Sequence, residues 1–275
     1  MTWFRSLPLS ARAAALTLGV IALLTLVGPW LSPWAFDAID FDGTWSAAPA
    51  LADQHWFGTD ALGRDLFART LTGGRVSLLV GLVGTLVSLL IGVAYGAIAG
   101  MLGGRIDALM MRAVDILYAL PFLFLVILLM VLFGRHLLLV FAAIGCVNWL
   151  DMARVVRGET LAIKQREFIA AAEVSGLDTS AILRRHVLPN LLGVIVVYAT
   201  LTVPQVIMME SFLGFLGLGV QAPATSWGAL ISEGARDMET APWALIFPAV
   251  FLLATLLFLN VLGEALRKAL DPRRR

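Results

Sequence analysis

Between Arg75 and Arg105 the chain contains no charged residue, and this stretch restricts the fold more than any other feature of the sequence. An α-helix needs only about 20 apolar residues to cross the hydrocarbon core of a bilayer. The whole chain follows the same trend, because 60% of its 275 residues are hydrophobic and 14% are charged, whereas soluble domains carry about 25% charged residues. Since helices satisfy their backbone hydrogen bonds internally in lipid, we expect an all-α integral membrane protein.

Six stretches have the composition expected of membrane-spanning helices. They lie at about residues 13–32, 77–99, 113–133, 137–153, 191–213 and 242–263. The first follows two arginines, as a signal peptide would, but its apolar core is too long for one and no A-x-A cleavage site follows it, so we predict an uncleaved anchor. The predicted divisions are an anchor with an external segment (1–72), a core (73–266) and a basic tail (267–275).

Lysine and arginine are distributed unequally between the two ends of the predicted spans. With the N-terminus inside the cell, 15 of the 20 basic residues fall on the inner side and 5 on the outer side. Because basic residues are enriched in cytoplasmic loops, we predict that both termini and the loop at 159–190 are cytoplasmic.

Small residues recur at every fourth position of the second predicted span: Gly84, Ser88, Gly92, Gly96 and Gly100. Positions four apart lie on nearly one face of a helix, and small side chains let a second backbone approach closely in a membrane. Two interpretations stay open, namely tight helix packing and a surface that lines a moving interface or pore.

Four residues inside the predicted spans are candidates for the pathway or its gating: Asp115, Pro121, Pro204 and Glu210. Proline removes a helical hydrogen bond and favours a kink, whereas a carboxylate at the helix centre costs about 2.5–3.5 kcal/mol on insertion scales. Asp115 follows Arg112 by three residues, so we expect these two side chains to pair. Glu210 has three open interpretations: it lines a cavity, pairs with an arginine of another span, or lies at the membrane surface.

The sequence contains no recognisable catalytic or metal-binding constellation. There is no G-x-x-x-x-G-K-[ST] motif for nucleotide phosphates, so any nucleotide hydrolysis that drives this protein belongs to another subunit. There is no G-x-S-x-G motif, and the three histidines lack ligand spacing with one another. We predict no catalytic residue and no bound metal, and the net charge of +1 gives no reason to expect nucleic acid.

The cytoplasmic loop has the pattern of two short helices joined by a turn. The first is predicted over about residues 159–175, and Gly176 suits the left-handed position that ends a helix. Asp178 is a favourable N-cap for the second helix, which Pro189 is expected to end. Leu177 is expected to project at the turn, where burial in a partner's groove would contribute about 1.5–3 kcal/mol. The loop is either a docking device or a plain surface hairpin.

The same loop resembles the EAA motif of permease subunits in binding-protein-dependent ABC importers. That motif reads E-A-A, three residues, G, nine residues, I-x-L-P, and the chain matches it at Ala171, Ala172, Gly176, Leu188 and Pro189. It departs at Ala170, where the motif has glutamate, so the role of that acid does not carry over, and at His186, where the motif has isoleucine. The resemblance implies that the residues that dock on an ATPase are Ala171, Ala172, Gly176, Leu177, Asp178, Leu188 and Pro189.

Two further segments, 57–78 and 209–231, resemble external and post-span stretches of the C-type permeases of peptide importers. The resemblance implies a MetI-like core of five helices with the first span added. It also implies a bacterial inner membrane, a B-type permease as heterodimer partner, two ABC ATPase subunits that hold the ATP and Mg²⁺, and an external substrate-binding protein. The implied substrates are di- or oligopeptides, although nickel chelates and glutathione use the same branch.

Two other functions compete with that of an importer subunit. A stand-alone secondary transporter would use Asp115 and Glu210 as proton sites, but it predicts inverted repeats with paired broken helices, which the sequence does not show. A membrane-embedded hydrolase would need catalytic residues that the sequence lacks.

Overall fold

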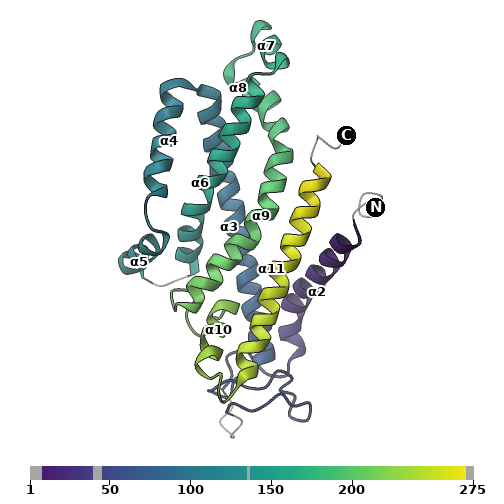
Figure 1. The fold of residues 1–275 in the computed structure, drawn as a ribbon. Helices are drawn as coiled ribbons and strands as arrows, with labels where there is room; N and C mark the ends of the chain where they lie inside the picture. Colours follow the sequence, from purple (N-terminus) through teal and green to yellow (C-terminus); the bar gives the residue numbers. More distant parts are fainter. Residues whose placement is uncertain (1–7, 40–44, 135–136, 271–275) are drawn as a thin grey trace.

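The computed structural model describes residues 8–39, 45–134 and 137–270 and is built from helices, as predicted (Figure 1). Within these residues there is no β-strand, only one isolated bridge between Thr59 and Asp65. The helices are α2 (Leu9–Leu31), α3 (Leu66–Leu102), α4 (Gly104–Tyr118), α5 (Phe122–Phe133), α6 (Leu137–Lys164), α7 (Glu167–Val174), α8 (Thr179–Ile182), the π-helix η1 (Leu183–Val187), α9 (Leu188–Phe215), α10 (Trp227–Arg236) and α11 (Pro242–Leu270). The end of the predicted basic tail, at 271–275, lies outside the described residues.

Four helices in the described part of the chain are long and apolar enough to cross a membrane: α2, α3, the continuous helix Thr179–Phe215, and α11. The predicted third span is not one straight helix, because α4 and α5 meet at an angle of 81°. Pro121 lies at this break, and proline both lacks an N–H donor and disfavours helical geometry in the residue before it. The predicted fourth span lies in α6, which continues beyond 153 to Lys164.

The long helices α3, α6, α9 and α11 form the body of the molecule, with α2 along α3 and α11. Figure 1 shows α7 at one end of this bundle, with α10 and the segment before α3 at the opposite end. The first residues of α2 and the last of α11 point toward the end that carries α7. The bent pair α4–α5 stands to one side, beside α6.

The small residues of α3 lie where this helix meets α6 and α9. A Cβ atom added at Gly92 would lie 2.6 Å from the Cβ of Met152, and one at Gly100 would lie 2.7 Å from the Cβ of Thr160. Gly96 faces the backbone of α6 between these positions, whereas Gly84 faces Val206 of α9. Ser88 is buried and donates to the Gly84 carbonyl at 2.8 Å. The backbones of α3 and α6 therefore approach each other to a distance that only small side chains permit.

The N-terminal helix α2 is attached to α3 by a polar contact at a proline. Pro29 lies inside α2, so the carbonyl of Thr25, four residues earlier, loses its usual helical donor. Arg75 of α3 supplies a donor: its Nε lies 2.7 Å from the Thr25 oxygen, and its guanidinium lies over the ring of Trp30 at 5.2 Å. Arg75 thus gives the Thr25 carbonyl a hydrogen-bond donor, which lipid could not provide.

Two other prolines inside helices also coincide with close contacts. Pro248 of α11 frees the carbonyl of Ala244, and a Cβ added at Gly234 of α10 would lie 2.6 Å from that oxygen. Pro204 is buried within α9 without ending it, and a Cβ added at Gly263 of α11 would lie 3.3 Å from the carbonyl of Thr200, four residues before this proline. Proline in these helices therefore accompanies packing against a neighbouring helix.

Candidate functional site

The loop at 159–190 begins where α6 ends at Lys164, and a short break precedes α7. Gly176 has a φ of +82°, which confirms the predicted left-handed position. The Gly176 N–H donates to the Glu173 carbonyl at 2.9 Å, and the Leu177 N–H donates to the Ala172 carbonyl at 3.1 Å. These two bonds close the end of α7 in the pattern of a Schellman motif, so the turn has one defined conformation.

The second half of the loop runs without interruption into α9. Asp178 precedes α8 with an extended backbone, and a hydrogen bond from the Ser180 hydroxyl lowers the pKa of its carboxyl. The prediction that Pro189 ends a helix is wrong, because α8, η1 and α9 form one continuous helix. The π-helical turn η1 ends at Val187, two residues before the proline, and its wider backbone accommodates a residue that cannot donate to the preceding turn.

The loop has a buried face and an exposed face. Ile169 and Ala172 of α7 pack with Ile182 and Val187 in one apolar cluster, to which Leu177 and Leu188 add partly buried side chains. The predicted projection of Leu177 is therefore wrong, because the closed turn folds this side chain inward. Val174 takes the outward position and is 90% exposed, while Ala170, Ala171, Gly176, Asp178 and Pro189 are also exposed.

Asp115 does not pair as the sequence predicts. Its carboxylate accepts a hydrogen bond from Arg154 of α6 at 3.0 Å, not from Arg112 in its own helix. A second pair joins the same two helices, between Asp107 of α4 and Arg157 of α6. Asp107 and Arg157 could not be paired from the sequence, because these residues are 50 positions apart.

Glu210 is completely buried at the junction of α3, α9 and the start of α10. Its Oε2 atom accepts a hydrogen bond from Ser77 at 2.8 Å, and the Ser77 oxygen in turn accepts one from the backbone N–H of Trp227 at 3.2 Å. Of the three interpretations for Glu210, pairing with an arginine of another span is not seen in the described part of the chain, where its hydrogen-bond donors are serines. The residue thus links α9 to α10 through α3.

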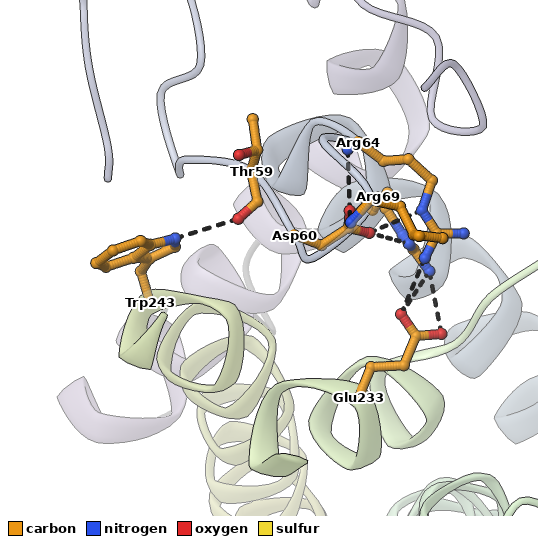
Figure 2. Close-up of polar contacts among 7 residues, drawn as sticks. Thr59, Asp60, Arg64, Arg69, Glu233 and Trp243 are labelled. Carbon is orange, nitrogen blue, oxygen red and sulfur yellow. Dashed lines mark hydrogen bonds and ion pairs between the residues drawn. The ribbon is translucent and has the colours of Figure 1, made fainter. Parts of the chain in front are cut away.

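A network of charged residues attaches the segment before α3 to α3 and α10 (Figure 2). Asp60 accepts from the backbone N–H of Leu62 at 2.8 Å and of Arg64 at 2.9 Å, and from the side chains of Arg64 and Arg69. Arg69 also donates to Glu233 of α10 at 2.9 Å. The four-residue spacing of Asp60 and Arg64 was a visible signal, but Glu233 could not be assigned because 164 residues separate it from Arg69.

Replacing Asp60 with alanine is expected to destabilise the segment before α3. The Arg69 side chain is 3% exposed, so loss of Asp60 leaves a buried guanidinium with only the half-exposed Glu233 as its partner. Breaking a buried ion pair costs about 3–5 kcal/mol, and the thermal unfolding midpoint of the purified protein should fall. Asp53→Ala, at an exposed position of the same segment, is the matched control; equal midpoints for the two variants would contradict the assignment.

Comparisons with known proteins agree with this architecture. The family described as "Binding-protein-dependent transport system inner membrane component" matches residues 92–275. The chain is 53% identical to the oligopeptide transport system permease protein OppC of Escherichia coli K12, over 97% of this chain and 88% of that protein. It is 47% identical to the dipeptide transport system permease protein DppC of Bacillus subtilis, over 96% and 82% of the two chains. The chain belongs to this transport family.

The fold of this permease component also has a match among solved structures. An inward-facing structure of the MetNI methionine ABC transporter superposes with a TM-score of 0.61, over 74% of this chain and 96% of that chain. At 19% identity the likeness concerns the fold. The predicted MetI-like permease fold is confirmed, and the chain is a membrane component of a binding-protein-dependent ABC importer.

Proposed function

We propose that this permease component is the C-type subunit of an ATP-driven importer of di- or oligopeptides, and that it pairs with a B-type permease to enclose the pathway. The oligopeptide and dipeptide permeases of Escherichia coli and Bacillus subtilis are 53% and 47% identical to it over nearly the whole chain. A glutathione permease of Shigella flexneri is 38% identical. The higher similarity to the peptide permeases supports peptides as the substrate class.

The cytoplasmic loop couples this subunit to a separate ATPase that binds ATP and Mg²⁺. The observation that carries this proposal is the closed turn at Gly176, which presents Val174 at 90% exposure while Ile169 and Ala172 stay buried. An apolar side chain held outward by a closed turn is suited to a groove on a partner. Because α8, η1 and α9 form one continuous helix, a push on the loop would reach α9 as the movement of a rigid body.

The loop and both termini lie on the cytoplasmic side of the bacterial inner membrane, and the segment before α3 lies outside. The distribution of basic residues supports this orientation, with 15 on the inner side and 5 on the outer side. The arrangement of the helices agrees with it, since the first residues of α2 and the last of α11 point toward the end that carries α7 (Figure 1). An external binding protein would deliver substrate to the opposite end.

Reconstitution of the assembled importer in proteoliposomes tests the proposal. We expect uptake of a labelled peptide that requires ATP on the loop side and the binding protein on the other side. The purified chain without its partners should hydrolyse no ATP. Peptide accumulation by the chain alone on a proton gradient would contradict the proposal and favour a secondary transporter.

A further inference from the structure

Helix α4 is attached to the rest of the molecule mainly by polar contacts. Only two of its residues, Asp107 and Val114, are buried. Its large apolar side chains are largely exposed, with Leu109 at 74% and Ile116 at 62%. Tyr95 of α3 donates from its hydroxyl to the Met110 carbonyl at 2.9 Å. A helix with so little buried apolar surface gains little from packing within this chain, so the remaining contacts set its position.

Two arginines one helical turn apart on α6 hold the two acids of α4. The Nε and Nη2 atoms of Arg157 lie 2.5 and 2.6 Å from the two carboxylate oxygens of Asp107, and the Asp107 side chain is 10% exposed. Arg154 donates to Asp115 at 3.0 Å, and its guanidinium lies over the ring of Tyr118 at 4.3 Å. A bidentate arginine–carboxylate contact fixes the relative orientation of the two side chains as well as their distance, so these pairs orient α4 on α6.

The helix that carries these arginines is also the helix that leads into the coupling loop. α6 ends at Lys164, whose ammonium donates to the Met101 carbonyl at 2.8 Å, and α7 begins at Glu167. Arg157 lies at the closest approach of α6 to α3, where its backbone faces Gly96 and Gly100. The loop is therefore joined to α6 across a break of only two residues, and α6 carries both arginines that contact α4, which bends by 81° to α5.

We propose that Asp107 and Asp115 are positioning residues of the transport cycle, which make α4 and the bend to α5 follow α6 when the loop moves. This inference rests on the proposed function of the loop. Neither acid contacts the substrate in this proposal. Their role is to make α4 and α5 move together with α6.

The experiment compares transport with ATP hydrolysis in the reconstituted importer. Asp107→Asn combined with Asp115→Asn should leave ATP hydrolysis intact but lower the peptide transported per ATP by about tenfold, within the range typical of coupling between sites. Exchanging the charges, with Asp107→Arg and Arg157→Asp together, should restore part of the ratio. Glu264→Gln is the matched control, because it removes an exposed ion pair with Arg267 and Lys268 near the inner end of α11 and should leave the ratio unchanged.

A distance measurement keeps the inference testable if the charge-exchanged variant does not fold. Spin labels at Leu109 of α4 and Glu159 of α6, both exposed, report the separation of the two helices in a background with Cys146 replaced. In the unchanged importer this separation should be the same with and without ATP. In the double asparagine variant it should broaden or shift on ATP binding. An unchanged transport ratio together with an unchanged separation would overturn the inference, whereas failure of the unmodified complex to import would overturn the proposed function instead.

Discussion

Val174→Asp is expected to abolish ATP-driven peptide uptake while the variant still folds and reaches the membrane. Val174 is 90% exposed at the end of α7, so the substitution removes no contact within the chain. In a partner's apolar groove, burial of a valine contributes about 1.5 kcal/mol or more, and an unpaired carboxylate there costs several kcal/mol more. A loss of about 3 kcal/mol corresponds to more than a hundredfold in affinity, so the ATPase subunit should no longer co-purify.

The controls for this prediction separate docking from folding. Leu51→Asp changes a side chain of similar exposure, 84%, in the segment at the opposite end of the molecule, and should leave co-purification of the ATPase unchanged. Leu177→Asp should act differently from Val174→Asp, because Leu177 packs on the cluster of Ile169 and Ile182 and its loss should lower the unfolding midpoint. Uptake at the unmodified rate in Val174→Asp would show that α7 is not the docking element.

The long spans could be predicted from the sequence because their signal is uniform and local. Continuous apolar composition predicts most ends of α3, α9 and α11 to within one or two helical turns. The exception is the start of α3, which lies at Leu66, earlier than the predicted 77. The bend at Pro121 could be anticipated as a kink, but its angle depends on the residues around it. The helix that continues through Pro189 could not be anticipated, since the π-turn that accommodates this proline has no sequence signature of its own.

Side-chain partners were less predictable than helices because most of them are distant in sequence. Helical spacing offers Asp115 only neighbours three or four residues away, which is why Arg112 was expected and Arg154 was not. The inward turn of Leu177 depends on the two hydrogen bonds that close α7, and composition does not reveal them. Glu210 was recognisable as an unusual acid, but the serines that surround it come from α3 as well as from its own helix.

Gly96→Ala is expected to have the second large effect, on the stability of the membrane core. A methyl group at Gly96 would overlap the Ala153 carbonyl and lie 3.0 Å from the Arg157 backbone nitrogen and the Val156 Cβ. Two rigid backbones cannot yield as a flexible side chain can, so α3 and α6 must separate along their contact. Overpacking of this kind costs about 1–3 kcal/mol, and close backbone contact is a main source of helix association in lipid.

The same substitution decides between the two interpretations of the small-residue stripe. For tight packing, Gly96→Ala should lower the amount of folded protein and its unfolding midpoint by several degrees. Gly158→Ala provides the control, because Gly158 lies in α6 with nothing within 4 Å of an added Cβ and alanine favours a helix over glycine by about 1 kcal/mol. If both variants unfold at the same temperature but only Gly96→Ala loses transport, the α3–α6 contact is a moving interface. That result would also require α6 to shift relative to α3 during the cycle, which is the movement that Arg154 and Arg157 would pass to α4.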